Sequence, residues 1–290
     1  MKIKILSLAV SAILMLTACG TNVGSNNSST PDSSSESETT TAETSETTVE
    51  TTETQPALVL PSTTNDSGKV MIQTVSKSSA YPFNSYIITS SNGESVVVDP
   101  TEMPGKDIVD INPAAIISTH SHEDHTDAKF SDSYDCPKIM YTKEDIKTKD
   151  FHIYTIWSQH DQNAPVAENS GNVIVVFEVD GLRIAHMGDI GQAEITPEQL
   201  EQLGKIDIAF MQLSNTYSSM NLTNKKGFKL LEQFNPTVVI PTHHSDSAYP
   251  IIEKKYGKVT MFDNALTISK EDLPQAPMNF YHISNTHKYN

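Results

Sequence analysis

Cysteine and basic residues are both scarce in this sequence. The 290-residue chain has two cysteines, Cys19 and Cys136, and 20 Lys and Arg against 36 Asp and Glu, for a formal net charge of −16 at pH 7. Clustered Lys and Arg supply much of a protein's affinity for nucleic acids, so this balance argues against a nucleic-acid partner. The sequence also has no nucleophile elbow and no phosphate-binding loop, which argues against serine-hydrolase and P-loop chemistry.

The apolar run at residues 5–16 is too short to span a membrane as a helix, which takes about 20 residues. It follows two lysines, as in a secretory signal peptide. The run ends in Leu16-Thr17-Ala18-Cys19, which resembles a bacterial lipobox. We therefore predict that residues 1–19 are a signal segment and that Cys19 receives lipid. Cys136 would then be the only thiol, which excludes an intrachain disulfide.

Residues 20–66 have the composition of a tether. They include 22 Ser or Thr among 47 residues, eight acids, and no Lys or Arg. Such a segment buries too little apolar surface to offset the entropy lost on ordering, so we expect it to be disordered. With lipid on Cys19, the tether would hold the following domain clear of the extracytoplasmic face of a bacterial cell membrane.

Residues 67–290 form the predicted folded domain, and about 220 residues are enough for one substantial core. Asn-Gly and Asp-Gly pairs between β-rich runs predict two hairpins, and Thr196 before Pro197 with Gln199 predicts a capped helix. The alternation of strands and helices indicates an α/β sandwich. The remaining expected elements are a strand at 114–119, a helix at 143–149, a strand at 206–213, a helix at 224–234 and a strand at 238–240.

The run that follows the strand at 114–119 is dense in metal-ligand residues. It reads His120-Ser121-His122-Glu123-Asp124-His125, with three imidazoles and two carboxylates within six residues. Divalent zinc, manganese and iron accept neutral imidazole together with carboxylate. The motif therefore predicts a metal site, and its mixture of ligand types indicates two ions.

Three further candidate ligands occur downstream: His160, Asp189 and His243. The last two follow apolar strands. In this order the residues resemble those of the metallo-β-lactamase superfamily, and the resemblance covers about residues 69–267.

The resemblance implies a four-layer αββα sandwich with two metal ions at one edge. Zinc would be the first candidate, with manganese or iron as alternatives. It also implies that Asp99, after the strand at 95–98, braces the metal loop without binding metal. Asp189 would bridge the ions. The first metal would be held by His120, His122 and His160, and the second by Asp124, His125 and His243.

Asp189 also bears on the branch of the superfamily, because the true β-lactamases lack an aspartate at this position. The stretch 180–189, with 195–200, resembles most closely the branch that contains L-ascorbate 6-phosphate lactonase. That branch usually has a Gly-Gly pair after the next strand. The corresponding segment here, 212–220, has no glycine.

His186 competes with His160 for a place at the metals. His186 and Asp189 are three residues apart near the end of a strand and would tend to point to opposite sides, so we prefer His160 and expect His186 to pack behind the ligands. His244 should face away from His243, toward the surface. Asn215 and Tyr217 follow the strand at 206–213 and are either substrate contacts or ordinary loop residues.

The chemistry expected of such a site is hydrolysis. Two neighbouring divalent ions lower the pKa of a shared water, supply hydroxide and stabilise the developing oxyanion. Asp124 would orient that hydroxide, and Asp189 would hold the ions at their separation. The expected substrate is a small ester, lactone or phosphodiester. The alternative is a lipoprotein that keeps the metal but serves only to bind or sense a ligand.

Overall fold

Among the described residues, more lie in strands than in helices. The computed structural model describes residues 62, 64–161, 166–168, 170–287 and 289. The predicted signal segment, and all of the predicted tether except residues 62 and 64–66, lie outside these residues. The chain divides into units 1–55 and 56–290, and every described residue belongs to the second. Among the described helices, none has the length and apolar character required to cross a membrane.

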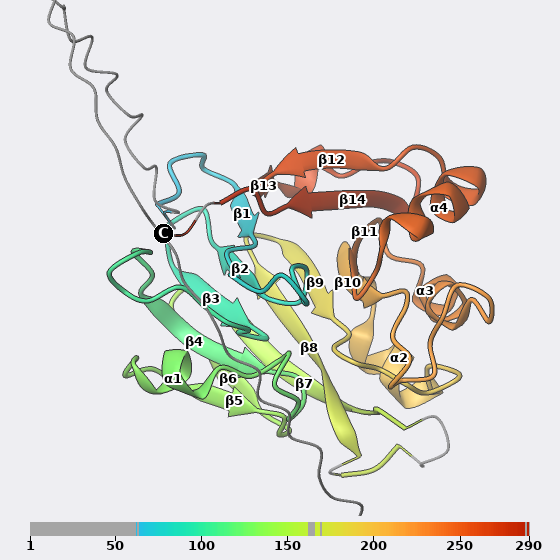
Figure 1. Cartoon of the computed structure of the whole chain (residues 1–290), viewed down its shortest axis with the longest axis horizontal. Helices are drawn as coiled ribbons and strands as arrows, with labels where there is room; N and C mark the ends of the chain where they lie inside the picture. Colours follow the sequence, from blue (N-terminus) through green and yellow to red (C-terminus); the bar gives the residue numbers. More distant parts are fainter. Residues whose placement is uncertain (1–61, 63, 162–165, 169, 288, 290) are drawn as a thin grey trace, which may run out of the picture. The chain divides into compact units, whose positions relative to one another are not determined.

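The first sheet has six strands (Figure 1). The four central ones are buried along their whole length or nearly so, which explains why they read as continuous apolar runs rather than alternating patterns. In order across the sheet the strands are β13 (Ala265–Ile268), β1 (Val70–Gln73), β2 (Tyr86–Thr89), β3 (Ser95–Val98), β4 (Pro113–Ser118) and β5 (Lys138–Met140).

The second sheet has eight strands, and β9, β10 and β11 run parallel to one another. Their carboxyl ends therefore meet at one edge, where loops from neighbouring strands come together. In order across the sheet the strands are β12 (Thr260–Asp263), β14 (Asn279–Ser284), β11 (Val238–Thr242), β10 (Ile208–Gln212), β9 (Leu182–His186), β8 (Gly171–Val179), β7 (His152–Gln159) and β6 (Asp145–Lys147).

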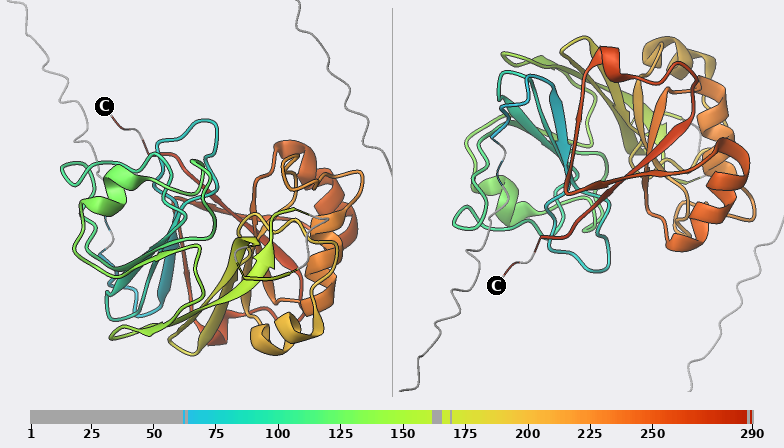
Figure 2. Two further views of the ribbon diagram at one scale, coloured as in Figure 1. Left: turned by 90° about the horizontal axis from the view of Figure 1, so that it is seen from below. Right: turned by 90° about the horizontal axis from the view of Figure 1, so that it is seen from above.

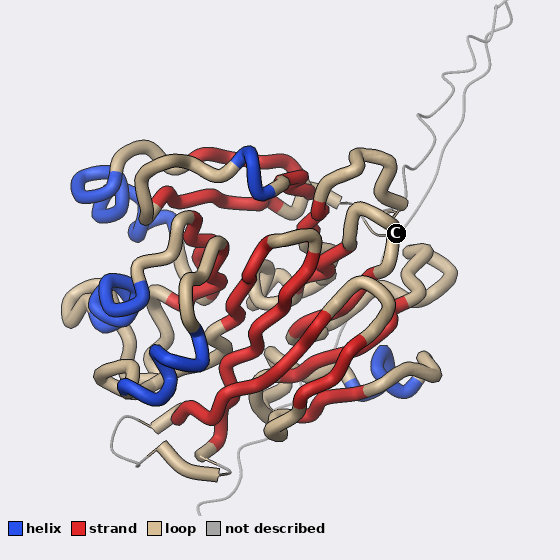
Figure 3. Tube along the Cα trace, turned by 180° about the vertical axis from the view of Figure 1, so that it is seen from behind, coloured by secondary structure: helices blue, strands red, loops and turns tan. Residues whose placement is uncertain are grey.

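The helices are short and lie outside the sheets (Figure 3). Thr196 accepts a hydrogen bond from Gln199 N, and the Gln199 side chain bonds back to Thr196 N, so the predicted capping box is present. The helices are α1 (Ala128–Asp132), α2 (Pro197–Leu203), α3 (Lys226–Phe234) and α4 (Tyr249–Tyr256), with 3-10 turns η1 (Asp246–Ala248) and η2 (Lys270–Asp272).

Three apolar clusters define four layers. One lies between the sheets and joins residues such as Ile88 and Phe210. A second packs Ile87 and its neighbours against Phe130 of α1. The third packs the outer face of the second sheet against α2, α3 and α4 through residues such as Leu203 and Leu231. The expected αββα sandwich is confirmed, and Figure 2 shows the sheets face to face with helices outside both.

Both predicted hairpins are present, as β2–β3 and β8–β9. The helix predicted at 143–149 is wrong, because this segment forms the edge strand β6, which pairs antiparallel with β7. Ile146 alone faces the core between charged neighbours. That single alternation fits an edge strand, and pairing with β7 overrides the local helix propensity of the lysines and glutamate.

Candidate metal centre

Loops from both sheets deliver the candidate ligands to one edge of the sandwich. The histidine motif follows β4 of the first sheet, and His160 follows β7 of the second. Asp189 lies in the turn after β9, and His243 follows β11. Candidate ligands that are far apart in the sequence therefore meet where the strands end.

These side chains form two groups, within each of which the candidate ligand atoms lie within 4.8 Å of one another. One group is His120, His122, His160 and Asp189. The other is Asp124, His125, Asp189 and His243. The division is the one that the family resemblance implied, with Asp189 in both groups.

The two carboxylate oxygens of Asp189 face different groups. Oδ2 lies 3.4 Å from His120 Nε2 and 3.5 Å from His160 Nε2. Oδ1 lies 3.4 Å from His125 Nε2 and 3.0 Å from His243 Nε2. One oxygen is therefore offered to each group, which is the arrangement that a bridging ligand needs.

The buried nitrogen and oxygen atoms at this site that lack hydrogen-bond partners in the described part of the chain are of the types that bind metal ions. His120 Nε2, His160 Nε2 and Asp189 Oδ1 are buried without a hydrogen-bond partner among the described residues. Native proteins seldom leave buried polar atoms unpaired, because the loss of hydration is not recovered. Three such atoms that converge, all of types that bind zinc, manganese or iron, are explained by divalent ions.

Asp99 contacts the metal loop as the resemblance implied. It is fully buried, its Oδ1 accepts a 2.7 Å hydrogen bond from Thr119 N, and its Oδ2 lies 2.7 Å from His125 Nδ1. This contact leaves His125 Nε2 directed toward the second group. A carboxylate on the far nitrogen fixes the ring orientation of a ligating histidine and raises its basicity.

The carboxylates and His120 are already in the protonation states that metal ions require. Burial raises the pKa of Asp189, but the neighbouring imidazoles of His125, His160 and His243 outweigh it, and the net pKa is well below its usual range. Burial, aided by His125, lowers the pKa of His120 to about 3. Ionised carboxylate and neutral imidazole are the metal-binding forms.

His125 differs from His120 because carboxylates surround it. Burial lowers its pKa, but Asp99, Asp124 and Asp189 together raise it well above its usual value. Its Nε2 lies 2.8 Å from His243 Nε2. In the metal-free protein a proton on His125 is therefore favoured, and it offsets part of the negative charge of the surrounding carboxylates. A bound divalent ion would offset the same charge.

The structure places His160, and not His186, among the candidate ligand atoms. His186 is buried behind them, where its ring stacks on Phe210 with centroids 5.2 Å apart. Its Nδ1 accepts a 3.1 Å hydrogen bond from Gly188 N and lies 3.6 Å from Asp99 Oδ2. His186 thus packs beneath the site, as the strand argument predicts.

Two buried amides at the site were not foreseen. Asn84 Nδ2 lies 3.4 Å from Asp124 Oδ2 and 3.0 Å from His243 Nε2. Asn172 Oδ1 accepts a 2.9 Å hydrogen bond from Asp189 N. Asn172 begins an otherwise apolar buried run in β8, and that anomaly is the only signal in the sequence that marks it.

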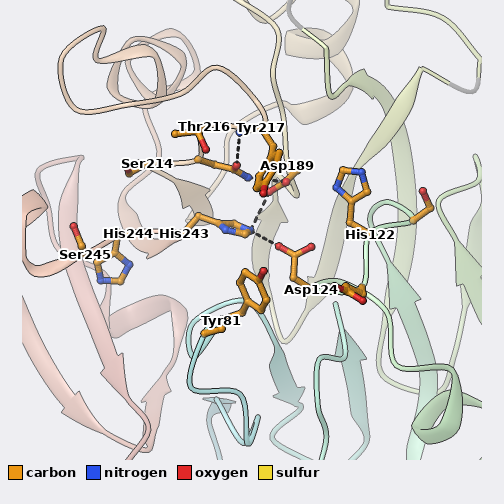
Figure 4. Close-up of a pocket in the computed structure, with 14 residues that line it drawn as sticks. Tyr81, His122, Asp124, Asp189, Ser214, Thr216, Tyr217, His243, His244 and Ser245 are labelled. Atoms are coloured by element: carbon orange, nitrogen blue, oxygen red, sulfur yellow. Dashed lines mark hydrogen bonds and ion pairs between the residues drawn. The ribbon is translucent and has the colours of Figure 1, made fainter. Parts of the chain in front are cut away.

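An open cleft of about 730 Å³ gives access to the two groups (Figure 4). Asp124, Asp189 and His243 line it, together with Asn215 and Tyr217. Asn215 is buried, and its Nδ2 donates to Asp189 Oδ2 over 2.7 Å, so it positions that carboxylate. Tyr217 is 82% exposed and free to contact a ligand.

His244 lines the same cleft, and the expectation that it is a surface residue is wrong. Its ring stacks on Phe83 with centroids 4.9 Å apart, and its Nε2 lies 3.1 Å from Tyr249 Oη. The left-handed backbone at His243, with φ of 40°, turns the chain so that His244 enters this aromatic cluster.

Comparison with known families agrees with this geometry. Residues 80–243, more than half of the chain, match the family model described as a beta-lactamase superfamily domain. The chain belongs to the metallo-β-lactamase superfamily. No curated protein matches the chain significantly.

Solved structures of two other proteins share the fold. One neighbour, assigned as a Zn-dependent hydrolase of the metallo-β-lactamase superfamily from Thermotoga maritima, is 16% identical with a TM-score of 0.53, over 74% of this chain and 98% of that one. Another, the metallo hydrolase Igni18 from Ignicoccus hospitalis, is 14% identical with a TM-score of 0.50, over 69% of this chain and 97% of that one. At these identities the matches establish the metallo-β-lactamase fold and no more.

Proposed function

We propose that this protein is a hydrolase that holds two divalent ions, zinc first, and cleaves a small ester, lactone or phosphodiester. The observation that carries the proposal is the Asp189 carboxylate, which offers one oxygen to each of two converging histidine groups at the floor of an open cleft. The resemblance to the lactonase-like branch supports a lactone or ester among these substrates.

The ions would be held by His120, His122, His160 and Asp189 on one side, and by Asp124, His125, Asp189 and His243 on the other. When bound, such ions activate water and polarise the scissile group as Lewis acids. Asp124 is partly exposed to the cleft, whereas Asp189 is buried. Asp124 is therefore the carboxylate placed to accept a proton from the attacking water, and Asn84 Nδ2 keeps its oxygen in position.

Metal analysis and a hydrolase screen on the same preparations test this proposal. His122→Ala should lower metal content and any hydrolysis together, because His122 belongs to the first group. His152→Ala is the matched control, since His152 pairs with Asp145 and Glu178 away from the cleft. Wild-type protein that binds no transition metal on titration would refute the proposal.

The second candidate is a metal-containing lipoprotein that binds or senses a ligand without catalysis. The segment 212–220, which lacks the glycines of the lactonase-like branch, favours it. Full metal occupancy without hydrolysis across a broad set of esters, lactones and phosphodiesters would select this alternative.

A further inference from the structure

Among the residues that the structure describes, neither Lys nor Arg lines the cleft. The absence of Lys and Arg also extends along the sequence on either side of the lining residues. The stretches that supply the lining contain neither Lys nor Arg; they are residues 78–105, 107–128, 184–204, 206–224 and 230–253. The stretch 150–182, which carries His160, also contains none.

Lys226 lies behind one of these loops but does not reach the cleft. It is 7% exposed, and its Nζ donates to Gly191 O over 2.6 Å and to Ser218 O over 2.7 Å. The ammonium group is thus used to fix the loop that carries Tyr217. It is not available to a substrate bound on the other side.

The charged side chains that line the cleft are acidic. Glu123 is exposed at the cleft, and Asp124 and Asp189 lie deeper. Divalent ions at the two histidine groups would be directed at the bond that reacts. Because Asp124 and Asp189 would be ligands of the ions, a further anionic group on the substrate, such as a carboxylate or phosphate, would find no Lys or Arg among the described residues of the cleft and would meet the exposed Glu123 carboxylate.

Two tyrosines flank the cleft. Tyr81, from the loop before β2, is 36% exposed, and Tyr217, from the loop after β10, is 82% exposed. Figure 4 shows them on opposite sides of His243. Exposed aromatic rings beside a binding site supply apolar contact area and stack on flat groups at little entropic cost.

We propose that the substrate is an uncharged ester or lactone whose apolar or aromatic part packs against Tyr81 and Tyr217, and that it carries no anionic group. This inference rests on the proposed hydrolase function and narrows it. A phosphodiester, a phosphorylated lactone or a carboxylate-bearing lactam does not suit the cleft.

A matched pair of esters tests the charge preference. The full-length, zinc-loaded protein is assayed with 4-nitrophenyl pentanoate and with the mono-4-nitrophenyl ester of glutaric acid. The two share a leaving group and acyl length and differ by one terminal carboxylate. We expect kcat/KM to favour the neutral ester by about tenfold or more at low salt, with the ratio falling as salt is added.

Thr216→Lys places an amine in the cleft without altering a candidate metal ligand. Thr216 is exposed and lines the cleft, and its side chain forms no hydrogen bond with another described residue. We expect this variant to reduce the neutral-to-anionic ratio about fivefold or more. An unchanged ratio would show that charge in the cleft does not govern the preference.

Tyr217→Ala tests the aromatic contact. We expect its KM for the neutral aryl ester to rise about fivefold with kcat little changed, because the ring contributes binding and not chemistry. Tyr141→Ala is the control, since Tyr141 is 42% exposed and does not line the cleft. Equal effects of the two substitutions would contradict the proposed contact.

Binding separates failure of this inference from failure of the hydrolase proposal. Calorimetry with pentanoic acid 4-nitroanilide and glutaric acid mono-4-nitroanilide measures affinity without requiring ester turnover. If the neutral anilide bound more tightly and no ester were hydrolysed, the hydrolase proposal would be refuted, but the inferred preference for a neutral ligand would stand. The neutral-substrate inference would be overturned if the anionic compounds were bound or hydrolysed as well as the neutral ones, or better. It would also be overturned if neither anilide bound.

Discussion

The Asp189 carboxylate is positioned by the protein itself. Asn172 accepts a hydrogen bond from its backbone N–H, Asn215 donates to its Oδ2, and Ser218 Oγ donates to its carbonyl oxygen. These contacts come from β8 and from the loop after β10. The two oxygens are therefore directed at the histidine groups by buried neighbours, which reduces the reorganisation needed when an ion binds.

Substitution of His160 and His186 separates the roles of the two histidines. We expect His160→Ala to lose most of one metal ion, because its Nε2 lies in the first group. His186→Ala should keep near-normal stoichiometry and alter mainly the rate. Elemental analysis of the two purified variants checks this, and the reverse pattern would assign the ligand role to His186.

Metal binding should release protons. The carboxylates around His125 raise its pKa well above the usual value, which favours the protonated ring in the metal-free protein. A metal ligand must be deprotonated, so binding displaces about one proton, and affinity should rise with pH while His125 is protonated. Calorimetry in buffers of different ionisation enthalpy measures the proton count, and zero release would contradict the raised pKa.

The candidate ligands could be predicted from the sequence because each lies in a short motif after an apolar strand. Asn84 and Asn172 could not. They act through contacts across 40 and 17 residues of sequence, to Asp124 and Asp189, and a lone amide does not show which distant residue it contacts. His244 was misplaced for a similar reason, because Phe83, on which its ring stacks, is distant in the sequence.

At the scale of elements, strands and caps with strong local chemistry were predictable. Asn-Gly and Asp-Gly turns, and the Thr196 capping box, determine their conformation within a few residues. β6 was not predictable, since its identity depends on pairing with β7 and on one side chain, Ile146, that reaches the core.

Gly191 brings two site loops together. Its N–H donates to Gln159 O over 2.6 Å, and a Cβ at this position would collide with His160 O. We expect Gly191→Ala to push His160 away from Asp189. The variant should bind less metal, and its unfolding temperature should fall by several degrees.

Gly105→Ala is the control for that substitution. Its Cβ would meet only the end of the Asp107 side chain, which can move. Thermal unfolding and metal analysis of both variants provide the comparison. A Gly191→Ala protein with normal metal content would show that the two loops can separate without consequence for the site.

At the scale of the whole molecule, the location of the protein remains a proposal drawn from its first residues. We expect labelled fatty acid to be incorporated at Cys19, because two acyl chains give stable membrane attachment whereas the apolar run at 5–16 is too short to span. Cys19→Ser should release the protein from the membrane fraction or leave it as a precursor. A wild type that incorporates no fatty acid would refute the lipid anchor.

Each histidine group draws residues from both sheets, since the loop after β4 belongs to one sheet and Asp189 and His243 follow strands of the other. Bound ions would act as cross-links that tie the two halves of the sandwich together at this edge. Folding and metal supply would then be thermodynamically linked, with a gain in stability of about 2.7 kcal/mol for each ion whose free concentration exceeds its dissociation constant a hundredfold. The melting temperature measured in metal-buffered solutions should therefore rise with the free zinc concentration. In a cell short of zinc, the protein would be less stable against unfolding as well as less active.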